Sequence, residues 1–297
     1  MSGCTVIRPN TRQSYAMGVK GIIFAEPTQD FGRLLQSLDP VTSVLVDICY
    51  GNLSFQGFKG SRFRGVDWPS LLRIAAIIGG TNPDLSGDMP FSKRHHASVC
   101  QKFGGRNPMD GVETVFIHGL YGCSVLLDWY SQGLASCAEK KDVLAFQRSY
   151  DAMLIGMLRQ IFRVSKRGIS VWFTVPLKPG TSRLRQGACL VPDIDQPKLL
   201  QELTCLSDLI VSQTDVWRDG IAHTVLVTDP LNKWELPAKS AAAFGLAALE
   251  PPDLAELIRK VSSQSVPESE CLEGFNPLDQ AISMGCECLE GGFCNMA

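Results

Sequence analysis

Residues 18–38 read GVKGIIFAEPTQDFGRLLQSL, and this stretch decides the fold class. It opens with a short apolar run, continues through the polar loop AEPTQD and ends in FGRLLQSL. The apolar residues of that last part recur at helical spacing, at Phe31, Leu34, Leu35 and Leu38. The stretch therefore predicts a strand, a loop and a helix in succession.

Other apolar runs predict further strands that alternate with helices. The run SVLVDI at residues 43–48 is β-branched and apolar on both faces, which is typical of a strand buried inside a parallel sheet. Similar runs are TVFIH at 114–118, GISVWFTV at 168–175 and DLIVS at 208–212, and helical patterns cover 67–80, 122–137, 143–164 and 199–206. Strands that alternate with helices imply right-handed βαβ crossovers. The sequence therefore predicts an α/β fold.

The domain boundaries follow from shifts in composition. Residues 1–17 read as an irregular arm, and residues 18–261 as a single α/β domain. Within that domain, residues 81–110 are rich in Gly and Pro and show no sustained periodicity, so we interpret them as an inserted surface excursion. Gly220, followed by residues 222–228, predicts a turn and a last strand that joins the sheet in the antiparallel direction. Residues 262–297 form an acidic, cysteine-rich C-terminal extension.

Composition and charge exclude several classes of protein. The chain has 297 residues, of which 45% are apolar and 20% charged, so it is neither fibrous nor disordered. The net charge of −2 divides into +4 for residues 1–260 and −6 for the remainder, so the protein is not built mainly to coat nucleic acid. No apolar run approaches the roughly 20 residues that span a bilayer, and the N-terminus lacks a secretory core. We expect a protein made in a cytoplasm, without membrane contact.

The cysteines fall into two groups. Seven are scattered, and those in apolar surroundings, such as Cys49, are typical of buried small hydrophobic residues. The other four are Cys271, Cys286, Cys288 and Cys294, in a polar, Gly-rich stretch. They are candidates for disulfides or for a latch, within the chain or between chains. A metal site is disfavoured because the paired C-x2-C spacing of structural zinc is missing.

The loop after the first strand is where folds of this kind cradle phosphate. A phosphate-binding loop needs glycines that let the backbone wrap the anion, a Lys for the terminal phosphates, and a Ser or Thr for Mg²⁺. The segment AEPTQDFGR at residues 25–33 has none of these in place. No lysine anywhere in the chain follows a glycine, so a shifted register does not supply the motif.

The succession of GVKGIIFA, SVLVDI, TVFIHGLYG, GISVWFTV, GACLVPDI, DLIVS, WELPAKS and PPDLAELIRKV over about residues 15–261 resembles the RecA-like P-loop ATPases encoded by bacteriophages. The resemblance implies a three-layer RecA-like domain with a mostly parallel central sheet. In that family the first strand runs into a Gly-rich GKT loop and the third strand ends in Asp-Ser. The resemblance also implies a vestigial nucleotide loop in this chain, in which Ala25, Thr28 and Asp30 stand at glycine positions, Phe31 at the lysine position and Gly32 at the position of the metal-binding hydroxyl. It places His118 and Gly119 where the third strand of the family ends in Asp-Ser, and Lys239 of the Ala-Lys-Ser turn is retained.

The altered loop predicts a pseudo-ATPase that binds no cofactor. Losing a Lys–phosphate contact and placing Asp30 about 4 Å from a phosphate each cost on the order of 4 kcal/mol. Together they remove about 8 kcal/mol, which is the binding free energy of a micromolar ligand. The alternative is another α/β protein that never bound nucleotide, and both interpretations predict no hydrolysis. An active ATPase with an unrecognised loop is the least favoured hypothesis, and it would depend on Lys239.

Two other groups of residues are candidates for a metal site and for a catalytic site. His95, His96 and Cys100 match no standard metal spacing, and a solvated loop is the favoured interpretation. His118, with Asp47 or Asp128 as a partner and Ser124 or Cys123 as a nucleophile, lacks the surrounding nucleophile elbow. A buried, hydrogen-bonded histidine is therefore the favoured interpretation of His118.

The segment at residues 59–65 is basic, with Lys59, Arg62 and Arg64 interleaved with aromatic side chains. Such a loop can contact a nucleic-acid backbone, or it can dock on the acidic tail of another copy. The modest charge of the body favours a protein partner over nucleic acid.

These observations lead to two functional hypotheses. The first is a non-catalytic phage-type RecA-like protein that serves as a structural or assembly subunit of the virion, associated with the capsid, neck or tail. Its partners would be other virion proteins or copies of itself, and its location the virion. The alternative is an accessory factor in phage DNA recombination that binds single-stranded DNA or a partner ATPase.

Overall fold

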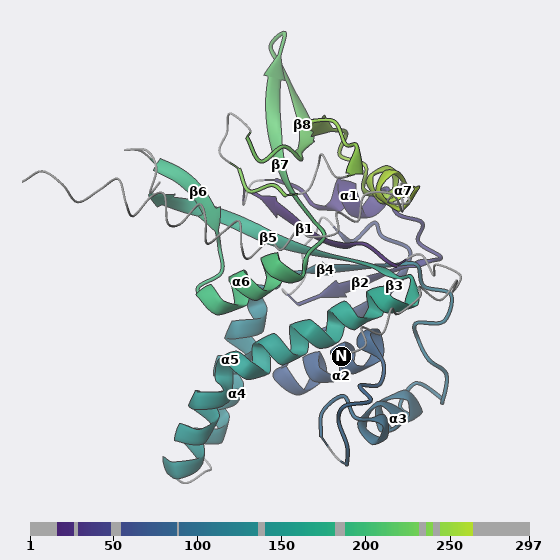
Figure 1. Cartoon of the computed structure of the whole chain (residues 1–297), viewed down its shortest axis with the longest axis vertical. Helices are drawn as coiled ribbons and strands as arrows, with labels where there is room; N and C mark the ends of the chain where they lie inside the picture. The colour runs from purple at the N-terminus through teal and green to yellow at the C-terminus, as the bar shows by residue number, and fades with distance from the viewer. Residues whose placement is uncertain are drawn as a thin grey trace, which may run out of the picture. The chain divides into compact units, whose positions relative to one another are not determined.

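The computed structural model describes residues 17–26, 29–48, 55–87, 89–135, 140–181, 188–231, 236–239 and 244–263. All but the first two residues of the predicted tail, and all but one residue of the predicted arm, lie outside this part. The described residues form an α/β fold with a mostly parallel central sheet, which confirms the predicted fold class (Figure 1).

The described strands form one sheet in the order β3-β2-β4-β5-β1-β7-β8-β9, with β6 paired to β5 outside this path. Neighbouring strands from β3 to β7 in that order are parallel, whereas β8, β9 and β6 join by antiparallel pairing. The bounds are β1 Lys20–Ala25, β2 Ser43–Asp47, β3 Ser61–Arg64, β4 Thr114–His118, β5 Ser170–Thr181, β6 Ala188–Pro192, β7 Leu209–Arg218, β8 Ile221–Val227 and β9 Leu249–Glu250.

The helices cover both faces of the sheet. Figure 1 shows α1 and α7 on one side and α2, α4, α5 and α6 on the other, and the two buried apolar clusters divide in the same way. The bounds are α1 Gly32–Gln36, α2 Trp68–Gly79, α3 Lys93–Gln101, α4 Gly122–Ala135, α5 Lys140–Phe162, the 3-10 helix η2 Arg163–Arg167, α6 Pro197–Leu206 and α7 Leu254–Ser263. No helix in the described part is both long and apolar enough to cross a membrane.

The central strands are buried on both faces, as the apolar runs predict. Every residue of β2 and β4 is buried, and β1 is buried from Gly21 onward. Gly21 lies beside Trp172 of β5 in register, and a Cβ at Gly21 would lie 2.2 Å from the Trp172 ring. A glycine at this position therefore leaves the space that the Trp172 ring occupies beside β1.

The predicted helix boundaries at Asp67, Gly80 and Gly168 are confirmed. The Asp67 carboxylate accepts a hydrogen bond from the Ser70 backbone, and the Ser70 hydroxyl accepts from the Asp67 backbone, so the two form a capping box at the start of α2. Gly80 follows the end of α2 with φ 73°, and Gly168 follows η2 with φ 80°. Both conformations favour glycine.

Three elements differ from the sequence-based expectation. Residues 61–64 of the predicted basic loop form β3, a short edge strand parallel to β2. The predicted surface excursion contains α3, which starts at Ser92, whose hydroxyl accepts from the His95 backbone. Only Val99 of α3 is buried, so the apolar periodicity that would reveal this helix is missing. The helix after β1 is shorter than predicted, with five residues in α1.

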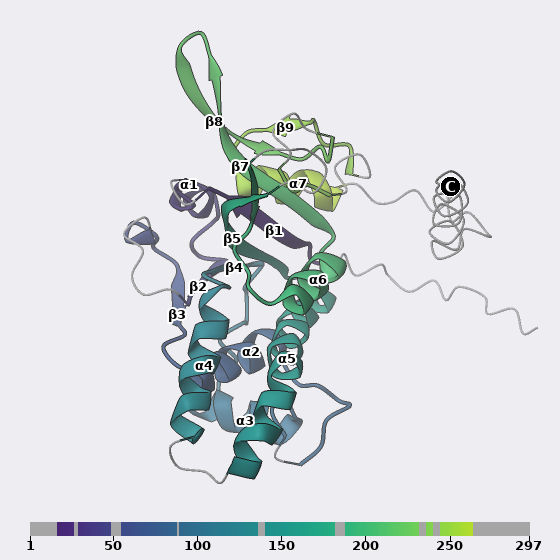
Figure 2. The same cartoon turned by 90° about the vertical axis from the view of Figure 1, so that its left-hand side faces the viewer.

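The β7–β8 hairpin extends away from the rest of the sheet (Figures 1 and 2). Its two-residue turn has Asp219 at φ 53° and Gly220 at φ 77°, as a tight turn matched to strand twist requires. Trp217 and Ile221, on either side of the turn, are 73% and 60% exposed. Beyond the hairpin, β9 pairs only with Leu226 and Val227, so it covers one end of the β8 edge.

Candidate functional site

The ends of β1, β4 and β5 define the place where a ligand of this fold class would bind. The chain leaves β1 through α1 on one face of the sheet, whereas α4 and α5 connect β4 to β5 on the other face. In open parallel sheets the crevice between such oppositely directed connections, at the carboxyl ends of the strands, is the usual ligand site. We therefore ask which side chains occupy it here.

Aromatic side chains of the chain itself occupy this position. Phe31, which stands at the predicted lysine position, is only 5% exposed and packs in the cluster beneath α1 and α7. Its ring centroid lies 5.5 Å from that of His118 at the end of β4, and Phe55 lies 4.6 Å from His118 in an edge-on contact. Ala25, at the end of β1, is fully buried in the same cluster.

His118 is a buried, hydrogen-bonded histidine. Its Nδ1 lies 2.8 Å from the Thr174 hydroxyl of β5, its partner in register. Burial lowers the pKa of His118 to about 4, so the ring is neutral at pH 7. Asp47 is buried at the matching position of β2. This arrangement joins the strand ends through their side chains.

The other members of the weighed catalytic group make separate contacts. The Ser124 hydroxyl donates to the Tyr121 carbonyl, and Cys123 is buried in the opposite cluster. Asp128 hydrogen-bonds Tyr150, which raises the Tyr150 pKa after the larger effect of burial. The described partners of His118 are instead Thr174 and the two phenyl rings.

Asp30 occupies a backbone donor at the start of α1. The Gly32 N–H donates to the Asp30 carboxylate over 2.7 Å. A bound phosphate would need such N–H groups, and the carboxylate already presents a negative charge to them. Thr28, the remaining glycine-position residue, lies outside the described part of the chain.

A polar network that the sequence did not reveal fastens this loop to the hairpin. The Gln29 amide donates to Asp215 of β7 over 2.8 Å, and Thr224 of β8 donates to the other Asp215 oxygen over 2.8 Å. Gln213 donates to the Gln29 side chain and to the Asp30 carbonyl, both over 3.2 Å. Because Gln29 and Asp30 meet the residues of β7 across more than 180 positions, no local spacing signals these contacts.

Lys239 lies at the end of α6 and has a structural role there. Its ammonium group donates to the carbonyls of Thr204 and Ser207, over 3.1 and 2.8 Å. Its backbone pairs with Ile210 near the start of β7, away from the strand ends where the loop of Phe31 lies. A cation that binds the last carbonyls of a helix stabilises the end of that helix.

The remaining predicted residues fall in separate places. Lys59 and Arg64 are exposed beside and on β3, and Arg62 is partly buried. The four tail cysteines, Cys271, Cys286, Cys288 and Cys294, lie outside the described residues, so their candidate disulfides stay a prediction. Among the scattered cysteines that the structure describes, Cys123 is buried, Cys205 is exposed, and Cys100 and Cys189 are intermediate; all four are free thiols.

The His95, His96 and Cys100 group lies on α3 rather than on a loop. The Cys100 sulfur is 3.7 Å from His96 Nε2, whereas His95 Nδ1 accepts from the Phe91 backbone over 3.0 Å. Burial is the main cause that lowers the pKa of both histidines. In the chain as far as the structure describes it, no three potential ligands come together as a metal site.

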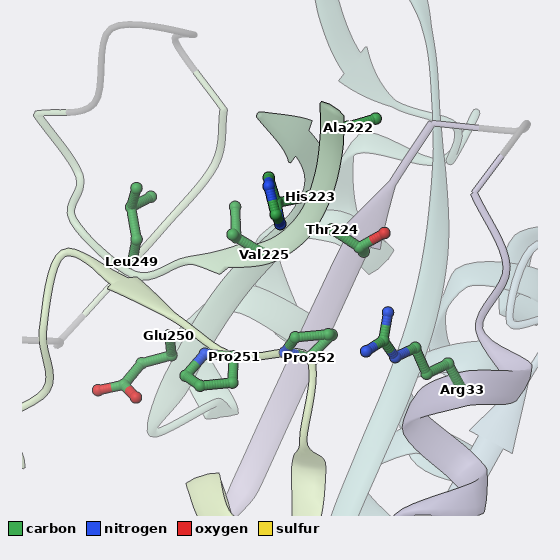
Figure 3. A pocket seen from close by; sticks show the side chains of 9 residues that line it. All are labelled: Arg33, Ala222, His223, Thr224, Val225, Leu249, Glu250, Pro251 and Pro252. Carbon is green, nitrogen blue, oxygen red and sulfur yellow. The ribbon is translucent and has the colours of Figure 1, made fainter. Parts of the chain in front are cut away.

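A groove of about 450 Å³ lies beside the uncovered part of the β8 edge. Figure 3 shows Arg33 reaching into it from α1 toward Thr224 and Pro252. Its wall is mixed in chemistry, and its lining residues are Arg33, Ala222, His223, Thr224, Val225, Leu249, Glu250, Pro251 and Pro252. The Glu250 carboxylate is already paired with Lys260, so Arg33 supplies the groove with a positive charge.

Comparison with known proteins finds likeness in structure but not in sequence. No family model matches the sequence, and no curated protein is significantly similar to it. Among solved structures, the flagellar accessory protein FlaH from Methanocaldococcus jannaschii is similar with a TM-score of 0.33 and 10% sequence identity. The match covers 71% of this chain and 77% of that protein.

Proposed function

We propose that this chain is a non-catalytic RecA-like protein of phage type, and that it serves as a structural or assembly subunit of a virion. The observation that carries the proposal is the occupied strand-end site, where Phe31 is buried against His118 and Asp30 binds the Gly32 N–H. The strands that carry the family resemblance also lie side by side in the sheet, in the order β2-β4-β5-β1-β7.

The physical argument concerns what a nucleotide would have to displace. Exposing a buried phenylalanine costs about 2–3 kcal/mol, and a phosphate near the Asp30 carboxylate adds electrostatic repulsion. Lys239, the lysine that the resemblance retains, does not offer its ammonium group to a phosphate beside His118, because it donates to the carbonyls at the end of α6. Tight binding of a triphosphate at this edge is therefore disfavoured.

The assembly role is supported by the surfaces around the hairpin. Trp217 and Ile221 are large apolar side chains in water, and the β8 edge beside the groove is covered by β9 at one end only. Uncovered strand edges and exposed aromatic residues are common contact points between proteins. A subunit that joins an assembly would bury this part of its surface.

The nucleotide half of the proposal is tested by isothermal titration calorimetry with Mg²⁺ and a non-hydrolysable ATP analogue. We expect no saturable binding below millimolar concentration, with an active P-loop ATPase as the positive control. A micromolar dissociation constant that Phe31→Ala strengthens or Asp30→Arg alters would overturn it, because the ligand would then occupy the strand-end site.

The assembly half is tested by mass spectrometry of purified particles and of infected cells. The chain should travel with the particles at a fixed ratio to the major structural proteins, and a non-reducing gel should show whether the tail cysteines link it to neighbours. Recovery of the chain only in the cell fraction would contradict a virion role.

An accessory role in phage DNA recombination is the second proposal, favoured by one observation. Lys59 and Arg64 are exposed around the β3 edge, where a nucleic-acid backbone would have access to them. Recovery in the cell fraction, together with salt-sensitive binding to single strands, would support this role over the first.

A further inference from the structure

A rigid turn ends α3 and displays an aromatic ring between two cations. Residues 102–106 read KFGGR, and all five are exposed. The Gly105 N–H donates to the Cys100 carbonyl and the Gly104 N–H to the Gln101 carbonyl, which is the Schellman pattern of helix termination. Gly104 and Gly105 have φ values of 72° and 77°, so the turn depends on both glycines.

Phe103 is held in place although it is exposed. Its ring stands at 89° to that of Phe63 on β3, with centroids 6.1 Å apart, and 45% of the residue is open to solvent. Phe63 in turn packs on the core cluster beneath α2. The backbone turn and the ring contact together fix Phe103 in one orientation, which lowers the entropy lost when a flat ligand stacks on it.

The two segments that meet at this ring contact carry cations and no acids. Residues 59–64 contain three Lys or Arg and residues 93–106 contain four, without a single Asp or Glu in either. In the described part of the chain, Arg64, Lys102 and Arg106 have no ion-pair partner. The positive charge of Lys102 also contributes, after burial and His96, to the lowered pKa of His95.

We propose that these residues form a binding surface for single-stranded nucleic acid, called here the Phe103 surface: Phe63, Lys102, Phe103 and Arg106. Phe103 would stack against a base, and the cations on either side of it, Lys102 and Arg106, would contact the neighbouring phosphates. Fixed aromatic rings among cations are the common means of binding single strands without sequence preference. An acidic protein could also contact the ring and the cations, so the ring variants and the duplex control below separate the two kinds of partner. The inference would supply the second proposed function with its contact surface, and it holds whether or not the strand-end site binds nucleotide.

The test is fluorescence anisotropy of the full chain, under reducing conditions, with labelled 25-nucleotide oligothymidylate and oligouridylate. Contact with two phosphates predicts that binding weakens about sevenfold between 50 and 200 mM salt. Phe103→Ala should weaken binding at least fivefold at either salt concentration, and Phe103→Trp should restore it. The double variant Lys102→Gln with Arg106→Gln should remove most of this salt effect.

The matched control is Trp129→Ala with Lys198→Gln, because it removes an exposed aromatic ring and an exposed cation from helices α4 and α6 instead. This variant should bind the oligonucleotides as the unaltered chain does. Phe103→Leu keeps an apolar contact with Phe63 but cannot stack, so it tests the ring separately from folding. Thermal unfolding followed by circular dichroism checks that each variant is folded.

Three results would overturn the proposal. The first is no binding of either oligonucleotide at 50 mM salt. The second is loss of binding in the double charge variant with unchanged binding in Phe103→Ala and Phe103→Leu, which would indicate a purely electrostatic surface suited to an acidic protein. The third is equal affinity for a duplex of the same length, since paired bases are not available to stack on Phe103. None of these measurements involves ATP, so the proposal fails or stands separately from the nucleotide test.

Discussion

At the scale of single residues, Phe31 and His118 explain how the strand ends are closed. A phenyl ring takes the place at which the resemblance puts a lysine, and a neutral imidazole takes the place of a carboxylate. Both side chains are buried, and they touch each other. The contact between Phe31 and His118 therefore stabilises the core, and it also fills the space at the strand ends.

Truncation of Phe31 should be costly. Phe31→Ala leaves a cavity beneath α1 and should lower the free energy of unfolding by about 3–5 kcal/mol in urea denaturation. Phe31→Leu, which refills most of the space, should cost less than about 1.5 kcal/mol. A loss below about 1 kcal/mol for the alanine variant would mean that Phe31 lies outside the packed core.

The buried His118 should make stability depend on pH. Its pKa is about 4 in the folded chain and about 6.5 when unfolded, so the unfolded state binds the extra proton between these values. Stability is then fully present above pH 6.5 and falls as the pH drops toward 4, by about 2 kcal/mol between pH 7.5 and pH 5. Urea denaturation of the protein and of His118→Gln at both pH values measures the difference, which corrects for the other three histidines. Parallel pH profiles for the two proteins would contradict a buried neutral ring.

At the scale of secondary-structure elements, Lys239 connects a segment late in the chain to α6 and β7. Lys239→Met keeps the apolar stem and removes the hydrogen bonds to the helix carbonyls, so it should lower the unfolding free energy by about 1–2 kcal/mol. Lys198→Met, in the exposed first turn of α6, is the matched control and should change stability by less than about 0.5 kcal/mol. Equal effects of the two variants on thermal unfolding would argue against the capping role.

The elements that could be predicted from the sequence are those with strong local signals. Buried runs such as SVLVDI fix strands, and Asp67 and Gly168 mark helix boundaries by their own chemistry. β3 was missed because a four-residue edge strand with two arginines has no apolar pattern, and α3 because a single buried residue gives no periodicity. Contacts between distant residues, such as Gln29 with Asp215, depend on the strand order and leave no trace in local spacing.

At the scale of the whole molecule, the residue types of the loop after β1 can be read from the sequence, whereas the side chains that pack around this loop cannot. The missing lysine and glycines could be read directly from residues 25–33. The stacking of Phe55 and Phe31 on His118 could not, because it depends on how the segment before β3 folds back over the end of β4. The same reasoning applies to Phe103, whose partner Phe63 is 40 residues away and on a strand that the sequence did not reveal.

The exposed hairpin leads to a prediction about assembly. If Trp217 and Ile221 contact neighbouring subunits, the double variant Trp217→Ala with Ile221→Ser should reduce association in sedimentation velocity by at least tenfold. Its stability should stay within about 0.5 kcal/mol, because both side chains are already in water. Val41→Ser, at another exposed apolar residue, is the control. An unchanged sedimentation distribution for the double variant would exclude the hairpin as a contact.

The hydrogen bonds from Gln29 to Asp215 and from Thr224 to Asp215 connect the β7–β8 hairpin directly to the loop after β1. We expect a partner bound at the tip of the hairpin to change the stability of these hydrogen bonds. The rate of amide hydrogen exchange at residues 29–32 should therefore report binding at the hairpin tip, without a label on the tip itself. A neighbour that binds the hairpin tip would in this way be detected at the loop after β1.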